Sequence, residues 1–169
     1  MKRIGYGQVE PNHLSAQRNG QIYGQRPAEG LDVIENGMFL KYTVNAGGKE
    51  VVSKTGDGEW MLVLNEVKLY DDAWRVSYKN YAMTPDNRGE MYPRLFKTNV
   101  GDIFTTNCFA VTKEENGEKT MADVAVGATV APNANGYLAA ASEGDMLWKV
   151  VKVYTMPDGQ DGVKLQRIK

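Results

Sequence analysis

Short apolar segments separated by turn sequences recur along the chain from about Leu31 to its end. The segment 38–44 begins apolar and then alternates, directly after Asn36-Gly37, and Asn116-Gly117 separates two later segments of the same kind. Asn-Gly favours tight turns because both residues tolerate a positive φ angle. No stretch combines a 3.6-residue apolar period with helix-capping residues. The pattern predicts an all-β domain over residues 31–169, folded as a compact antiparallel β-barrel or sandwich.

The most distinct hairpin is predicted at the C-terminus. Residues 147–154 and 162–168 alternate apolar and polar side chains on either side of Pro157-Asp158-Gly159. Proline presets one turn angle and glycine supplies the other, so this tripeptide reverses the chain. We expect the two segments to pair as antiparallel strands.

The middle of the chain is less regular. Residues 59–70 predict a strand that is buried on both faces, and residues 73–83 predict a strand with one solvent-exposed face. Pro85 and Pro93 argue against regular central strands in the following segment. We therefore expect residues 84–99 to form an exposed loop.

The first 30 residues differ from the rest, because glycine and glutamine dominate and apolar residues occur singly. Such a segment is not expected to bury itself against its own side chains. We predict an extended N-terminal arm over residues 1–30 beside the β-domain of residues 31–169. Two interpretations stay open: a disordered tail, or an arm that becomes ordered on a partner protein.

If the arm binds a partner, its aromatic, aliphatic, arginine and glutamine side chains are the candidate contacts. Tyrosine provides contact area at a low entropy cost, and arginine provides forked hydrogen-bond donors. The candidate binding residues are Ile4, Tyr6, Gln8, Val9, Leu14, Arg18, Ile22, Tyr23, Gln25 and Arg26.

Composition narrows the functional classes. The formal net charge of the 169 residues is -1, which disfavours sequence-independent binding to nucleic acid. Cys108 and His13 are the single cysteine and histidine, too few for a Cys/His zinc site or an intramolecular disulfide. Cys108 lies in an apolar strand, where a buried, unreactive thiol is expected. We predict no metal, no cofactor and no enzymatic activity.

The beginning of the chain carries no apolar signal segment, and no apolar run along the sequence approaches membrane-spanning length. Adjacent carboxylates at Asp71-Asp72 and Glu114-Glu115 point to opposite faces of a strand, so we interpret them as solvated turn residues rather than an acid–base pair. We expect synthesis in a cytoplasm and no contact with a membrane.

Three stretches carry a resemblance to a known group of proteins: residues 2–8 (KRIGYGQ), residues 15–23 (SAQRNGQIY) and residues 35–42 (ENGMFLKY). They resemble small head proteins of tailed bacteriophages. The resemblance implies a capsid decoration protein, an auxiliary part of the virion that binds the major capsid protein lattice. It also implies a β-domain that clusters with copies of itself, and an N-terminal segment that ties this domain to the shell.

Two other functions remain open. Trp60, Trp74 and Trp148 on a β-scaffold would suit a receptor- or carbohydrate-binding module. A head-completion or tail component would share the general features of a decoration protein. The sequence does not separate these alternatives, and it leaves the oligomeric state open.

Overall fold

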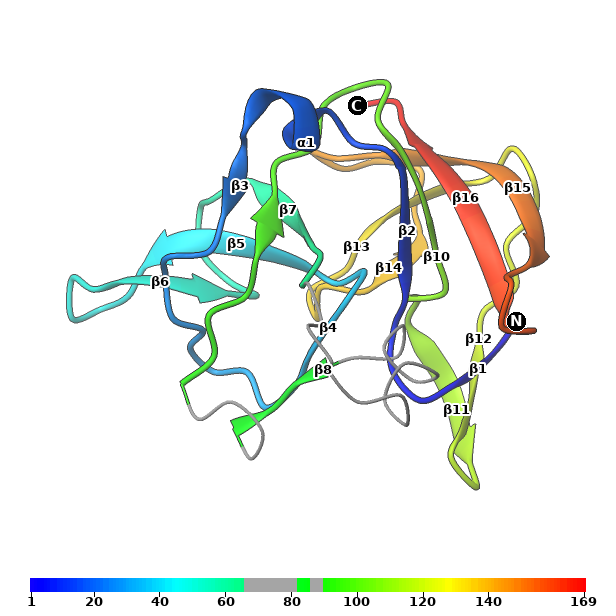
Figure 1. Cartoon of the computed structure of the whole chain (residues 1–169), viewed down its shortest axis with the longest axis horizontal. Coiled ribbons are helices and arrows are strands. Elements are labelled where there is room, and N and C mark those ends of the chain that lie inside the picture. Colours follow the sequence, from blue (N-terminus) through cyan, green and yellow to red (C-terminus); the bar gives the residue numbers. More distant parts are fainter. Residues whose placement is uncertain (66–81, 86–89) are drawn as a thin grey trace.

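The computed structural model describes residues 1–65, 82–85 and 90–169, and this part of the chain is an antiparallel all-β fold. It contains four β-sheets and one short helix, α1 (Ser15–Asn19) (Figure 1). The predicted fold class is confirmed. No sheet closes into a barrel within the described ranges.

The largest sheet has six strands in the order β14-β13-β15-β16-β10-β2. Its C-terminal hairpin is the predicted one: the amide of Gly159 donates to the carbonyl of Met156 at 2.9 Å, which closes the turn. Strands β13 and β14 form a second local hairpin, whereas β10 pairs with β16 and with β2, which lie far from it in sequence. The strands are β2 (Val9–His13), β10 (Ile103–Thr106), β13 (Thr129–Pro132), β14 (Leu138–Ala140), β15 (Trp148–Thr155) and β16 (Asp161–Arg167).

A second sheet has five strands in the order β3-β9-β7-β5-β6. Its strand β5 begins after Gly37, whose φ of 93° provides the turn expected at Asn36-Gly37. The strands are β3 (Ile22–Tyr23), β5 (Phe39–Val44), β6 (Glu50–Ser53), β7 (Trp60–Val63) and β9 (Leu95–Phe96).

Two small sheets complete the described fold. One has the order β1-β12-β11, with β1 (Lys2–Ile4), β12 (Glu118–Met121) and β11 (Val111–Glu115). Its hairpin turns at Asn116 and Gly117, both with positive φ, as expected for Asn-Gly. The other pairs β4 (Ile34–Glu35) with β8 (Ala82–Met83).

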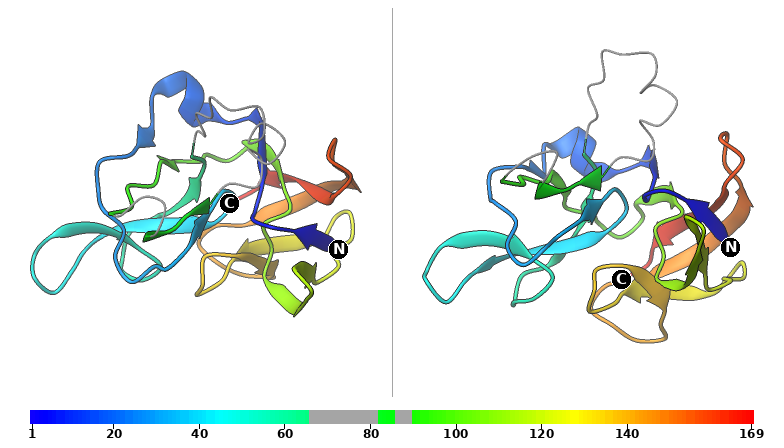
Figure 2. Two further views of the ribbon diagram at one scale, coloured as in Figure 1. Left: turned by 60° about the horizontal axis from the view of Figure 1, so that its bottom comes forward. Right: turned by 90° about the horizontal axis from the view of Figure 1, so that it is seen from below.

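The two large sheets share one hydrophobic core. Trp148 from the six-stranded sheet is fully buried and meets Phe104 edge to face at 4.8 Å between ring centroids. The ring centroid of Phe39, from the five-stranded sheet, lies 5.9 Å from that of Trp148. Each fully buried side chain of this size contributes about 1.5–3 kcal/mol relative to an exposed one. The views in Figure 2 show the two sheets as separate layers.

The expectation of an exposed loop over residues 84–99 is wrong at β9. Leu95 and Phe96 are 0% and 2% exposed, and β9 lies between β3 and β7 in the five-stranded sheet. Pro93 precedes this strand, so it removes no hydrogen bond from the sheet. Of the predicted strands, residues 66–70 and 73–81 lie outside the described residues, as do Trp74 and the pair Asp71-Asp72.

The expectation that residues 1–30 cannot bury themselves is also wrong. The segment is largely extended, but it supplies β1, β2, α1 and β3, each strand of which pairs with a strand of the remaining chain. Leu14 and Ala16 are 2% and 0% exposed in the main core. Backbone pairing at sheet edges needs few apolar side chains, which is why a segment rich in glycine and glutamine can join the fold. Residues 1–30 are therefore part of the β-structure rather than a separate arm.

Candidate functional site

The N-terminal segment meets the rest of the chain at a tightly packed seam. We call this the N-terminal seam; it consists of Arg3, Gly7, Gln8, Glu35, Asn36, Gly37, Thr106, Asn107 and Cys108. At Gly7, a Cβ atom would lie 2.4 Å from the carbonyl oxygen of Asn36 and 2.7 Å from the sulfur of Cys108. At Gly37, it would lie 2.5 Å from the Cβ of Cys108. Only glycine permits this approach of three backbone segments.

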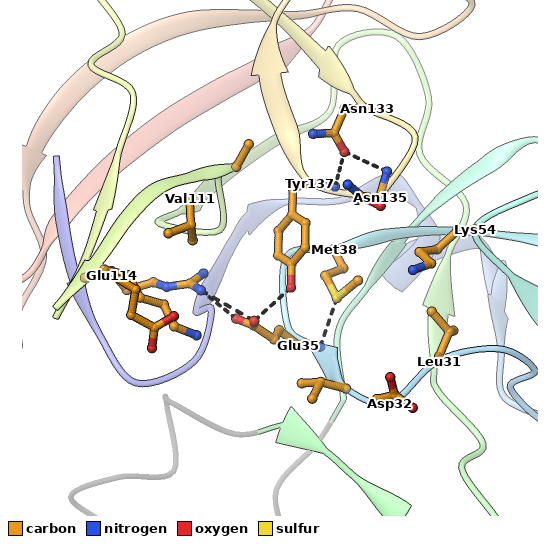
Figure 3. Close-up of a pocket in the computed structure, with 14 residues that line it drawn as sticks. Leu31, Asp32, Glu35, Met38, Lys54, Val111, Glu114, Asn133, Asn135 and Tyr137 are labelled. Carbon is orange, nitrogen blue, oxygen red and sulfur yellow. Dashed lines mark hydrogen bonds and ion pairs between the residues drawn. The ribbon is translucent and has the colours of Figure 1, made fainter. Parts of the chain in front are cut away.

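A buried ion pair lies at the centre of the seam. The Arg3 guanidinium contacts the Glu35 carboxylate at 3.0 Å, and the two side chains are 0% and 3% exposed. The same carboxylate accepts hydrogen bonds from the amide of Gly7 at 2.6 Å and from the hydroxyl of Tyr137 at 2.9 Å. Figure 3 shows the Tyr137 hydroxyl directed at Glu35. These donors compensate a charge that would otherwise be costly to bury.

The Glu35 carboxylate raises the pKa of two weakly acidic groups beside it, the Cys108 thiol and the Tyr137 hydroxyl. Burial raises the pKa of the Cys108 thiol, and the negative charge of Glu35 raises it further. Burial and the same charge also raise the pKa of the Tyr137 hydroxyl. Both groups therefore stay protonated at neutral pH, and the expectation that Cys108 is buried is confirmed. A protonated, enclosed thiol is a poor nucleophile.

Hydrogen bonds to Gln8 hold the next part of the segment. The amide of Gln8 donates to Asn107 at 2.8 Å, and the Thr106 hydroxyl donates to the Gln8 carbonyl at 2.6 Å. The Gln8 side chain also donates to Asp158 at 2.6 Å. The seam thus fixes the segment mainly through polar contacts, each of which needs a specific partner.

A pocket of about 460 Å³ opens beside the seam (Figure 3). Its charged lining is balanced, with three basic and three acidic side chains: Arg3, Lys54, Lys119, Asp32, Glu35 and Glu114. An ion of either sign therefore gains little net attraction there. The contacts of the seam join the N-terminal segment to residues 35–37 and 106–108.

The candidate binding residues of the N-terminal segment divide by exposure. Gln8 and Leu14 are buried in the interior of the chain, so in this state they cannot contact a partner. Val9, Ile22 and Arg26 are half-buried. The exposed ones are Ile4, Tyr6, Arg18, Tyr23 and Gln25.

The structure gathers some of these residues around Tyr42, which sequence reasoning did not single out. Tyr23 meets Tyr42 edge to face at 5.6 Å between ring centroids. Arg26 lies 4.3 Å over the Tyr42 ring and forms an ion pair with Glu50 at 2.8 Å. We call Tyr23, Arg26, Tyr42 and Glu50 the Tyr42 patch. Tyrosine and arginine are the residue types that dominate binding hot spots.

The other candidates lie elsewhere. Ile4 is 61% exposed on β1, and the ammonium group of Lys119 lies 5.5 Å over the ring of Tyr6. Arg18 is exposed on α1 beside His13, at 2.9 Å from its ring. The ten residues therefore do not form one continuous surface.

The described residues contain neither a cluster of metal-ligating side chains nor a helix suited to span a membrane. No group of three or more His, Cys, Asp and Glu side chains is placed to hold a metal ion in residues 1–65, 82–85 and 90–169. Within the same ranges, no helix has the length and apolar character needed to span a membrane.

Comparisons of the chain with protein-family models, with curated proteins and with solved structures found no match.

Proposed function

We propose that this protein is a non-enzymatic structural protein of a tailed-phage head, a capsid decoration protein that binds the major capsid protein lattice and stabilises the shell. The observation that carries the proposal is where the three stretches resembling small phage head proteins lie in the fold. Residues 2–8 and 35–42 meet at the Arg3–Glu35 ion pair, and residues 15–23 and 35–42 meet at the contact between Tyr23 and Tyr42. The resemblance thus falls on residues that interact with one another.

In this proposal the N-terminal segment binds the shell as a folded surface rather than as a free arm. The Tyr42 patch supports this, because its aromatic rings and its arginine are already held in place by the five-stranded sheet. A preorganised surface avoids most of the entropy cost of ordering a flexible segment on binding. Copies of the protein would assemble on the capsid after synthesis in the host cytoplasm.

Copy number tests the proposed function directly. Quantitative mass spectrometry of virions should find the protein in numbers comparable to those of the major capsid protein. If each virion holds only enough copies to form a single ring, the protein is instead a connector or tail component. Absence from the virion would overturn the proposal.

Point variants test the proposed surface. Tyr23→Ala combined with Arg26→Ala should reduce binding to purified heads that lack the protein, while Tyr92→Ala should not. Tyr92 is a matched control, since it is also an exposed tyrosine, at 43%, but lies outside the Tyr42 patch. Unchanged binding by the double variant would exclude this patch as the contact.

A further inference from the structure

Trp60 lies where two surface pockets adjoin. The first pocket, of about 450 Å³, is formed with the loop 56–59 and with Lys41 and Arg167. The second, of about 270 Å³, is formed with residues of β13 and β14 and with Glu143. Both are lined by Trp60, Asp145 and Met146. The first pocket has the size of an ordinary small-ligand site, about 300–1,000 Å³.

The indole ring of Trp60 is held in a fixed position at this junction. Lys41, its partner across β5 and β7, places its ammonium group 4.6 Å from the ring centroid. The same ammonium donates to the carbonyl of Gly56 at 3.0 Å, which ties the loop 56–59 to the sheet. Trp60 is half-buried and packs partly against the main core. Trp60 therefore lines both pockets while part of its ring is in contact with Lys41.

Hydrogen-bonding groups surround the ring. Asp57 and Asp145 are exposed carboxylates that form no ion pair within the described part of the chain. Glu59 is held by Lys97 at 3.1 Å and by Arg167 at 3.7 Å. Carboxylates accept hydrogen bonds only, whereas the lysine and arginine groups donate them.

The charge of the lining indicates which ligands fit. The first pocket carries Asp57, Glu59 and Asp145 against Lys41 and Arg167, and Glu143 in the second pocket adds a further negative charge. A phosphate or an acidic peptide is therefore disfavoured. The cation–π position on the Trp60 ring is already taken by Lys41, which leaves less reason for a cationic ligand to bind there.

We infer that the two pockets around Trp60 form a binding site for a neutral saccharide chain. The apolar C–H face of a pyranose ring would stack on the part of the indole that Lys41 does not cover, and its hydroxyl groups would donate to Asp57 and Asp145. The two adjoining pockets would accommodate consecutive sugar units. This inference does not depend on the proposed capsid function, because the site shares no residue with the Tyr42 patch and can be tested on the isolated chain.

The test is a titration of the full-length protein with cellohexaose, maltohexaose, chitohexaose and mannohexaose, followed by an array of bacterial surface glycans. Saturation-transfer NMR would detect binding. Because the chain has three tryptophans, protection of the fluorescence from acrylamide would report contact with Trp60 only where Trp60→Ala abolishes it. We expect at least one saccharide to bind. Trp60→Ala should weaken binding about tenfold or more, since it removes both the stacking and the apolar contact area.

A second variant, Asp145→Asn, tests the same site in case Trp60→Ala disturbs the core. Asp145 is exposed, so Asp145→Asn should leave the circular dichroism spectrum unchanged while it weakens saccharide binding. Tyr92→Ala, an exposed aromatic outside the site, should leave binding unchanged. The inference is overturned if no glycan binds, if binding survives both variants, or if a lysine-rich peptide binds in a salt-sensitive manner where the saccharides do not.

Discussion

Arg3 and Glu35 form an ion pair that is almost completely inaccessible to solvent, with 3.0 Å between the guanidinium nitrogen and the carboxylate oxygen. Arg3 lies on β1 in the three-stranded sheet, whereas Glu35 ends β4 in a different sheet. The pair therefore connects two sheets whose strands share no backbone ladder in the described chain. If this ion pair is broken, we expect the N-terminal segment to separate from the rest of the fold.

Removing one partner of this pair should be strongly destabilising. Arg3→Met leaves the Glu35 carboxylate buried without its counter-charge, and we expect the free energy of unfolding to fall by about 3–5 kcal/mol. The double variant Arg3→Met with Glu35→Gln should recover much of this loss, because no uncompensated charge remains. Urea denaturation followed by circular dichroism measures both values.

The exposed pair of Lys2 and Glu118 is the matched control for that experiment. These side chains lie 2.8 Å apart but are 69% and 43% exposed. Lys2→Ala should therefore leave the midpoint of urea denaturation nearly unchanged. Equal losses of stability in the two variants would show that the buried pair does not hold the N-terminal segment in place.

Deleting residues 1–13 should unfold the protein rather than release an arm. The deletion removes β1 and β2, exposes the edge of β10, and takes away both Arg3 and the Gly7 amide from Glu35. A two-dimensional ¹H–¹⁵N spectrum should lose its dispersion. Tyr6→Ala, an exposed change within the same segment, should keep a native spectrum. A well-dispersed spectrum for the deletion variant would restore the picture of a detachable arm.

Local turn chemistry made much of the β-fold predictable. Asn36-Gly37, Asn116-Gly117 and Pro157-Asp158-Gly159 each reverse the chain where the sequence indicated. These signals depend only on adjacent residues and their permitted φ angles. At the C-terminal hairpin both flanking strands were placed correctly, and a strand follows Asn36-Gly37 as expected, whereas strands β4 and β11, which precede the two Asn-Gly turns, were not predicted.

The N-terminal seam was not predictable by these means. Arg3 and Glu35 are 32 positions apart, and the amide of Gln8 reaches Asn107 across 99 positions. Neither Arg3 nor Gln8 carries a local signal of burial, since arginine and glutamine are usually exposed. Leu14 looked isolated because its apolar neighbours come from other parts of the chain. Two of the candidate binding residues, Tyr23 and Arg26, lie beside Tyr42, and this grouping depends on the fold rather than on any local sequence pattern. Their role in binding stays a prediction.

The packing at Gly7 should not tolerate a methyl group. A Cβ at this position would approach the backbone oxygen of Asn36, in the turn between β4 and β5, to 2.4 Å, and a backbone atom cannot move aside as a flexible side chain can. We expect Gly7→Ala to destabilise the protein by about 1–3 kcal/mol, the usual cost of overpacking. Gly24→Ala is the control, since a Cβ there would lie 3.5 Å from its nearest neighbour, the Cγ of Arg94. Its midpoint of thermal unfolding should stay close to that of the wild type. Similar midpoints for the two variants would contradict the packing described at the seam.

Stability should decline at alkaline pH because of Cys108. Its pKa is raised above the ordinary value of 9.0 by burial and by Glu35, so the folded chain keeps a proton that the unfolded chain loses above that pH. The unfolded state then binds fewer protons than the folded state, and the free energy of unfolding falls by about 1.4 kcal/mol per pH unit for this one group. Tyr137, whose pKa is raised above 10.0, adds to the decline at higher pH. Urea titrations of Cys108→Ala between pH 8 and pH 10 should show a flatter dependence than the wild type, whatever its stability at neutral pH. An identical slope in both proteins would mean that the thiol is solvated, and the seam would then be open to water.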